Sequence, residues 1–328
     1  MNKTAIKRGF HWNPITQSLG IHVNGVQVAD YSTIVGRIYY VNNILGSSSS
    51  DGLSWGTAFD QVETAVAASE TYRQLGGVPG GAAVTTNDFV RNTIIVQGTG
   101  TAYTAVTSIP NYVDIIGLGA DPRGNGTGIA QIDGAGVADC ISISSAGCRG
   151  LFMANMQLDQ SSAGGVIGLD AAKLFRSRLE GCAFTNQGTS GIRIVLGGGV
   201  YINDCACTND TFAQITGLTL GNGATVNGCK ITNSEFFGDT QGVSFTAVAG
   251  KQTVFRDCMA IGGTKGFVDS TSSDVGAQPW YVRCYGFGTN NTTINQTGFV
   301  LSSNFTKRSI GCLDNANGTV RNYPTTTD

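Results

Sequence analysis

The chain has 328 residues, of which 13% are charged, and its formal net charge is −2 at pH 7. This length accommodates one large β domain, and the sequence has no basic cluster, which argues against nucleic-acid or membrane partners. No apolar run reaches the roughly 18 residues that a membrane-spanning helix needs. The first eight residues are followed by Gly-Phe-His-Trp and not by a hydrophobic run, so we also expect no signal peptide.

Residues 1–37 are expected to form a small segment of their own. Within it, Asn24-Gly25 separates two short alternating runs between Leu19 and Val28, which predicts a β-hairpin with a two-residue turn. A single hairpin is only marginally stable and needs a partner surface. Phe10 and Trp12 lie in the same segment, which has too few apolar residues for a core, so we expect them to dock it on another protein.

Residues 38–91 are predicted to lead into the main body of the protein and to contain its one helix. Phe59, Val62, Ala65 and Val66 follow helical spacing, and the pattern continues to about Tyr72. The open end of a strand-built solenoid exposes unpaired edges and an apolar interior. An amphipathic helix just before the coils is therefore expected to cap them.

Residues 92–320 contain two phrases that recur in step. The first is Gly-Φ-x-Φ, where Φ is an apolar residue, with weaker copies at Gly165 and Gly266. The second is a bulky residue, two turn-forming residues and a cysteine, repeated at steps of 23, 24, 29 and 26 residues. The clear copies of the first phrase begin at Gly191, Gly217, Gly242 and Gly298, and those of the second end at Cys182, Cys205, Cys229, Cys258 and Cys284.

These repeats predict a parallel β-helix. Each apolar piece has three to five residues, alternates with a period of two and ends in Gly, Asn, Asp or Ser, which indicates strands and turns. Helical repeats would need longer apolar runs at a spacing of three to four. The nine-residue stretch 270–278 interrupts the period, and residues 321–328 are expected to form a tail without a further coil.

The cysteines and asparagines are predicted to form structural ladders. The chain has nine cysteines. A buried column of free thiols is favoured over a disulfide, because cysteine is a compact core residue that stacks well. A metal site is disfavoured because Cys205-Ala-Cys207 has no histidine nearby. Three asparagines follow their cysteines by four residues, and their amides are expected to stack along one corner: Asn186, Asn209 and Asn233. We expect no metal and no cofactor.

These coils resemble the right-handed parallel β-helix of the pectate-lyase-like superfamily. The stretch from Tyr39 to Phe59 looks like the start of such domains in bacteriophage tailspikes, and the Leu19–Val28 hairpin is similar to hairpins that open many phage virion proteins. The resemblance implies an all-β fold with a helical cap and a docking segment. It also implies a homotrimer in a virion assembled in the host cytoplasm, with capsid or tail proteins as partners.

Candidate catalytic residues are few. A glycan hydrolase needs two carboxylates about 5–9.5 Å apart, and the candidates on the coils are Asp204, Asp210, Glu235 and Asp257. Asp210 and Glu235 follow their cysteines by five and six residues, so they are expected to be neighbours on consecutive coils. Turn acids that bind backbone amides remain the favoured interpretation of all four. The coils have no histidine and match no polygalacturonase or pectate lyase pattern.

Trp280 and Tyr285 are the candidate binding residues on the coils. They are expected to be exposed and to contact a host glycan or a partner protein, whereas the equally weighted alternative places aromatic residues of this stretch in the core. We therefore expect a non-catalytic virion component used for decoration or adhesion. A tailspike-type polysaccharide depolymerase is the alternative, and a secreted adhesin of the same fold is a third hypothesis.

Overall fold

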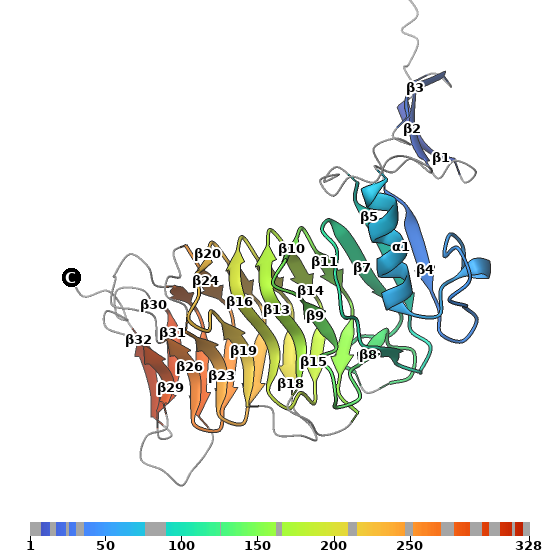
Figure 1. Cartoon of the computed structure of the whole chain (residues 1–328). Helices are drawn as coiled ribbons and strands as arrows, with labels where there is room; N and C mark the ends of the chain where they lie inside the picture. The colour runs from blue at the N-terminus through green and yellow to red at the C-terminus, as the bar shows by residue number, and fades with distance from the viewer. Residues whose placement is uncertain are drawn as a thin grey trace, which may run out of the picture.

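The computed structural model confirms that the chain forms a parallel β-helix (Figure 1). The structure describes residues 8–13, 18–23, 26–30, 36–75, 90–124, 126–161, 166–208, 215–246, 252–269, 279–288, 297–301, 309–316 and 319–323. For residues 8–30 only the backbone is described. Three sheets run side by side along the axis of the coil, and we call them sheets I, II and III.

Sheet I has ten strands, and sheet II also has ten. In sheet I these are β4 (Ile38–Val41), β5 (Asn92–Gln97), β7 (Val113–Leu118), β11 (Phe152–Ala154), β14 (Arg178–Glu180), β17 (Tyr201–Asn203), β21 (Lys230–Thr232), β24 (Val254–Arg256), β27 (Trp280–Val282) and β30 (Ser309–Ile310). In sheet II they are β6 (Tyr103–Thr104), β8 (Gln131–Asp133), β12 (Gln157–Asp159), β15 (Ala183–Thr185), β18 (Ala206–Thr208), β22 (Glu235–Gly238), β25 (Met259–Gly262), β28 (Tyr285–Gly288), β31 (Cys312–Ala316) and β32 (Thr319–Tyr323).

Sheet III has nine strands and includes the longest ones of the coil. Its strands are β9 (Ile141–Ile143), β10 (Cys148–Arg149), β13 (Ile167–Phe175), β16 (Ser190–Gly198), β19 (Thr216–Leu220), β20 (Val226–Asn227), β23 (Gln241–Phe245), β26 (Lys265–Asp269) and β29 (Thr297–Leu301).

The core is built by inward residues that stack on the same position of successive coils. In sheet I this column is aliphatic at first and becomes aromatic toward the C-terminal end, where the rings of Phe255 and Tyr281 stack with centroids 5.3 Å apart. Such stacking fills the interior with closely packed apolar groups and rings. The column consists of Ile94, Ile115, Met153, Leu179, Ile202, Ile231, Phe255 and Tyr281, all buried.

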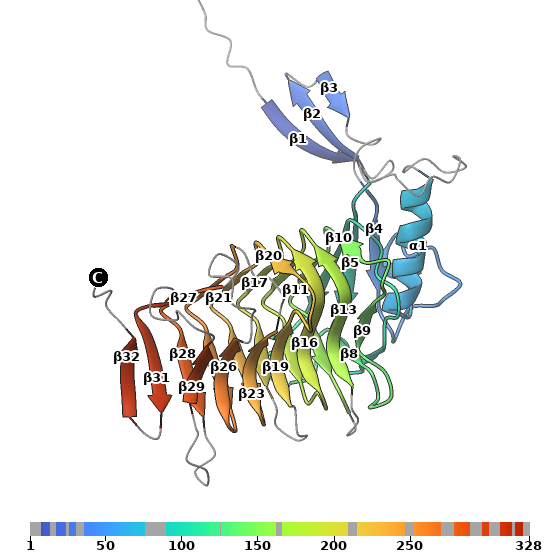
Figure 2. The same cartoon turned by 60° about the vertical axis from the view of Figure 1, so that its left-hand side comes forward.

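The capping helix α1 (Val62–Gln74) lies beside β4 and β5 at the N-terminal end of the stack (Figures 1 and 2). It buries Val62, Ala65 and Val66 against the first coils, as the helical spacing predicted. Phe59, also expected in the helix, instead pairs with Val41 in a parallel bridge. The short 3₁₀ helix η1 (Trp55–Thr57) precedes this bridge.

Single residues in the left-handed conformation turn the chain at two corners of most described coils. At the corner from sheet I to sheet II, their φ angles lie between 49° and 62°. This region favours Gly, Asn and Asp, whose backbone or short polar side chain tolerates it. The column there is Asn155, Gly181, Asp204, Asn233, Asp257, Arg283 and Gly311, and the corner from sheet III to sheet I has Tyr112, Gly150, Arg176, Gly199, Gly228 and Gln252.

The register corrects the expected cysteine column at one step. Ile202 pairs with Ile231, which places Ser234 opposite Cys205 and leaves Cys229 at the other corner, opposite Val200. The sequence motif is similar at the two corners because, at both, a side chain donates a hydrogen bond to the backbone carbonyl two residues earlier. The Cys229 thiol donates to the carbonyl of Asn227 at 3.6 Å, and the Ser234 hydroxyl donates to that of Thr232 at 2.7 Å. The column is Met156, Cys182, Cys205, Ser234, Cys258, Cys284 and Cys312.

The expected asparagine column is wrong at Asn233 for the same reason. Asn233 lies in the left-handed column between Asp204 and Asp257, and its amide donates to Asn203 Oδ1 at 3.0 Å. Asn186 lies at a different corner and donates to Asp159 Oδ1 at 2.9 Å. Asn209 lies outside the described residues. The amides therefore bond to other side chains of neighbouring coils and do not form one stack from Asn186 to Asn233.

The weak Gly-Φ-x-Φ copy before Gly191 also shifts. Leu169 pairs with Ile192, so the copy in register begins at Gly168 and not at Gly165. Gly165 itself lies outside the described residues, as does the stretch 270–278. The other weak copy is in register, since Phe267 pairs with Val243.

The two ends of the chain carry antiparallel strands. β2 (Ser18–Val23) and β3 (Val26–Asp30) form the predicted hairpin, in which Val23 pairs with Val26. An additional strand, β1 (Arg8–Asn13), pairs with β2 and was not predicted. At the other end, residues 321–323 belong to β32, which pairs antiparallel with β31, so they are not part of a tail. In Figure 1 the N-terminal sheet lies outside the stack of coils.

The described residues include no helix long and apolar enough to cross a membrane.

Candidate functional site

Two of the expected catalytic acids, Asp204 and Asp257, occupy left-handed corner positions and are ion-paired. Arg123 Nη2 lies 2.7 Å from Asp204 Oδ1. Arg283, one coil further, donates two hydrogen bonds of 2.6 Å to the two carboxylate oxygens of Asp257. These bonds hold the pKa of Asp257 below its usual range. A carboxyl held ionised in this way is a poor proton donor for glycoside hydrolysis.

Of the other expected pair, the structure describes only Glu235. Glu235 is exposed on sheet II and pairs in register with Ala206 and Met259. Asp210 lies outside the described residues. The expected proximity of the two acids depended on aligning Cys229 with Cys205, and the register excludes that alignment. Glu235 thus faces solvent beside a methionine and an alanine.

Sequence reasoning missed a carboxylate pair on sheet II, Asp133 and Asp159, which are direct register partners on adjacent strands. Asp159 accepts hydrogen bonds from Gln131, Thr185 and Asn186, at 2.9, 2.6 and 2.9 Å. The signal was present as Gln131-Ile-Asp133 and Gln157-Leu-Asp159, the same triplet one coil apart.

Asp159 lines a polar cavity of about 230 Å³. Asp133 accepts backbone hydrogen bonds from Ala135 and Ser161, so both carboxylates serve as acceptors for the surrounding turns. The lining of the cavity includes Gln131, Gln157, Asp159, Thr185 and Asn186.

The cysteines are buried structural groups. All nine are free thiols inside the protein. Burial raises the pKa of Cys148 to about 12 and that of Cys229 to about 11. Because the thiolate is the reactive form, Cys148 and Cys229 are not nucleophiles at neutral pH. No group of three or more His, Cys, Asp or Glu residues in the described part of the chain could hold a metal ion.

The expected binding aromatics separate onto different faces. Trp280 is 44% exposed on the outer face of sheet I, whereas Tyr281 beside it is buried in the core. Tyr285 is half-buried on sheet II, where its ring lies 6.2 Å from that of Phe287 in a stacked arrangement. Trp280 and Tyr285 therefore do not form one binding platform. Phe10 and Trp12 lie on β1, and their side chains are outside the described residues.

A groove with mixed aromatic and basic lining lies on the outer face of sheet I. Its volume is about 530 Å³. The guanidinium carbon of Arg178 lies 5.9 Å from the ring centroid of Phe152 and 5.2 Å from that of Tyr201, on the two adjacent coils. These residues are more than twenty positions apart in sequence, so only the register brings them together. The lining is Arg91, Asp114, Leu151, Phe152, Arg176, Ser177, Arg178, Gly199 and Tyr201.

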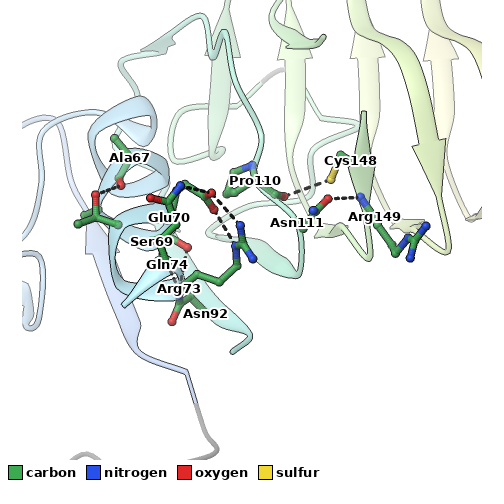
Figure 3. Close-up of polar contacts among 12 residues, drawn as sticks. Ala67, Ser69, Glu70, Arg73, Gln74, Asn92, Pro110, Asn111, Cys148 and Arg149 are labelled. Carbon is green, nitrogen blue, oxygen red and sulfur yellow. Dashed lines mark hydrogen bonds and ion pairs between the residues drawn. The ribbon is translucent and has the colours of Figure 1, made fainter. Parts of the chain in front are cut away.

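A second cavity of about 460 Å³ lies between the capping helix and the first coils. Arg73 and Glu70 are paired through two 2.8 Å bonds beside it, and Gln74 donates to the same carboxylate (Figure 3). Burial opposes the charge on Glu70, but the bonds from Arg73 and Gln74 outweigh it and lower the pKa of Glu70. These bonds lie within the capping helix itself.

No protein-family model and no curated protein matches the chain. Several solved structures are similar to it in fold. A pectate lyase, Pel9A, has 16% identity and a TM-score of 0.42, and the match covers 82% of this chain and 58% of that one. YbhC of Escherichia coli has 14% identity and a TM-score of 0.43, with 88% and 79% covered. A pectin methylesterase from Aspergillus niger has 14% identity and a TM-score of 0.40, with 83% and 93% covered.

The chain spans 58% of the length of the Pel9A structure. At these identities the likeness concerns the fold alone, a parallel β-helix, which hosts many unrelated functions.

Proposed function

We propose that this parallel β-helix is a non-catalytic component of a bacteriophage virion, displayed on the particle as a decoration or adhesion protein. One observation carries the non-catalytic part: Asp204 and Asp257 are corner residues paired with arginines. A hydrolase needs one carboxyl that stays protonated and another that stays free. Neither residue has this freedom.

The N-terminal segment supports the docking role. Residues 8–30 form an antiparallel sheet of three strands, which is separate in topology from sheets I to III. A sheet this small has little core of its own and gains stability by packing on another surface. We propose that this surface belongs to a capsid or tail protein.

The outer face of sheet II supports assembly into a homotrimer. Toward the C-terminal end its outward positions are apolar, and Leu313 is 39% exposed. Exposed apolar patches on a sheet are typical of contact surfaces. We propose that copies of the chain pack against one another through these residues: Phe237, Met259, Ile261, Tyr285, Phe287 and Leu313.

Light scattering during size-exclusion chromatography tests the trimer. The full chain, of 34.1 kDa, should elute with three times that mass. Ile261→Lys should shift the mass toward one chain, because a buried lysine without a partner opposes association. Ser244→Lys, on sheet III, is the matched control and should remain trimeric. A wild-type protein that elutes as a single chain contradicts the proposed assembly.

Two assays test the virion role. Antibodies against the chain should label intact particles in electron microscopy. In the second assay, host surface polysaccharide is incubated with the protein, and its chain length should not change. Particles without label would contradict the proposal, and so would shortening of the polysaccharide.

A depolymerase is the second candidate, and the register pair Asp133 and Asp159 is the observation that favours it. Parallel strands place direct partners about 4.8 Å apart, close to the carboxylate spacing of retaining glycosidases. If this candidate is right, the wild-type protein shortens the polysaccharide and both Asp133→Asn and Asp159→Asn abolish the shortening. Asp204→Asn should then keep it.

A further inference from the structure

We propose that the groove on the outer face of sheet I binds a carboxylate-bearing glycan across Phe152, Arg178 and Tyr201. This inference rests on the proposed adhesion role and names the ligand class and the residues that hold it. Trp280 belongs to the same face, but it lies three coils beyond Tyr201 and outside the groove.

The side chains of the groove occupy one column of register partners. Asp114 pairs with Phe152, Phe152 with Arg178, Arg178 with Tyr201, and Tyr201 with Lys230. Successive coils are about 4.8 Å apart, so the two rings lie about 10 Å apart along the axis with Arg178 between them. A ligand that contacts both rings must be extended along the coil, as a polymer is.

Arg178 is held ready for an anion. The two rings on either side restrict its guanidinium, and Glu180 binds one of its nitrogens at 2.5 Å. Its side chain is still 50% exposed. The guanidinium has five N–H donors in a fixed plane, so donors remain for an oxyanion from solvent. A carboxylate fits this planar donor pair.

The surrounding charge favours an anionic ligand. Three arginines line the groove against one aspartate, and Asp114 is paired with Arg91. Arg176 is exposed and makes no ion pair within the described part of the chain. Lys230, also exposed, extends the positive potential by one more coil. A carboxylate beside Arg178 therefore also gains from Arg176 and Lys230.

The aromatic rings and the overall charge select a glycan over a nucleic acid. Phe152 and Tyr201 line the groove, and aromatic rings are surfaces on which the C–H face of a sugar ring can pack. Binding of a nucleic acid depends on a continuous basic track along its phosphates. The groove has only a few basic side chains on adjacent coils, and the whole chain has a net charge of −2.

Affinity electrophoresis of the full chain tests the proposal. The gels contain hyaluronate as the uronic-acid polymer, dextran as the neutral polymer, or single-stranded DNA as another polyanion. Hyaluronate should retard the wild type, and salt should weaken the effect. Arg178→Gln and Tyr201→Ala should each raise the apparent Kd about tenfold, because each removes one of the two kinds of contact.

The control variants distinguish binding at this groove from a non-specific effect of positive charge. Arg193→Gln removes an ion-paired arginine from sheet III and should leave the Kd within about twofold. Arg176→Asn, which keeps a residue that tolerates the left-handed corner, should weaken binding. Circular dichroism checks that each variant is folded.

Several outcomes overturn the proposal. These are equal retardation by dextran or DNA, no retardation by hyaluronate, and unchanged binding of Arg178→Gln and Tyr201→Ala. The outcome of this test does not depend on whether the virion proposal is correct. Hyaluronate binding lost in Arg178→Gln would stand even if particles carried no label, and labelled particles with no groove binding would remove only this inference.

Discussion

Asp204 and Asp257 are candidate catalytic acids by sequence, but their backbone conformation gives a structural reason for an aspartate at each position. Both have φ near +50° at the corner from sheet I to sheet II, where Asn233 and Gly181 occupy equivalent positions. A left-handed residue with a Cβ costs roughly 1–2 kcal/mol, and Asp and Asn lower this cost by bonding locally. The positions of this column therefore share a backbone conformation and not a chemical role.

Substitution of Asp204 should follow this conformational preference. We expect Asp204→Val to lower the free energy of unfolding by about 1–2 kcal/mol, since a β-branched residue is strained at positive φ. Asp204→Asn tolerates the angle and loses only the exposed pair with Arg123, which is worth about 0–1 kcal/mol. Urea denaturation of both variants measures the difference. Equal loss in the two variants would contradict the argument.

The pair of Asp257 and Arg283 predicts a small pH dependence. Because the folded pKa of Asp257 is lowered, its contribution is present above the unfolded pKa of about 3.9 and is lost as the pH falls through the folded value. Asp257→Asn should therefore melt below the wild type at pH 7, and the two should converge toward about pH 2. A melting difference that stays constant from pH 7 to pH 2 would exclude this cause.

At the scale of the element, each coil turns twice by the same device. A left-handed residue is followed by a Cys, Ser or Thr in many coils, and Cys182, Cys229 and Ser234 each donate to the carbonyl two residues earlier, as does Ser177. A small donor at this position gives the carbonyl a second hydrogen bond, beside the one that it accepts from a backbone amide of the preceding coil. Serine and cysteine are thus interchangeable parts of the corner.

Ser234 provides the test of this interchange. Its hydroxyl donates to Thr232 O and accepts from the amide of Cys205 at 3.1 Å. Ser234→Ala leaves the buried amide of Cys205 without this acceptor, while Thr232 O keeps the bond from the amide of Asp204, and should lower the free energy of unfolding by about 1–3 kcal/mol. Ser234→Cys keeps the donor found elsewhere in the column and should cost less. Chemical denaturation compares the two, and the idea fails if cysteine is as damaging as alanine.

At the scale of the whole molecule, the sheets enclose one continuous core and the helix closes its N-terminal end. Asn92, buried at the first coil, donates from its amide to Ser69 on α1 at 2.9 Å and accepts from the amide of Arg37 (Figure 3). The cap is therefore bonded to the coil as well as packed on it. No thiol in this core reaches the surface.

The closed core predicts that the native protein resists alkylation. Iodoacetamide at pH 8 should leave the folded chain unmodified and should add nine carbamidomethyl groups in urea, as read by intact mass, because all nine thiols are buried. Ser48→Cys, in an exposed loop, serves as the positive control and should react at once. Rapid labelling of the native wild type would show that the core opens.

Much of the fold was predictable because its signals are local. Short alternating strands, glycine-rich turns and a period of about 23 to 29 residues are all properties of neighbouring residues, and they identified the β-helix, the capping helix and the N-terminal hairpin. The burial of the cysteines followed from the same repeat. Local signals also show how scarce acids are on the coils.

Only the tertiary structure decided the register between coils, and with it the candidate site. Two corners with the same chemistry made Cys229 look equivalent to Cys205, although backbone pairing places it at the other corner. The groove joins Phe152, Arg178 and Tyr201 from three different coils, and no local pattern links residues so far apart. Pairing between strands is a non-local property. The sequence therefore predicted the coil, whereas the strand register determined which residues share an outer face.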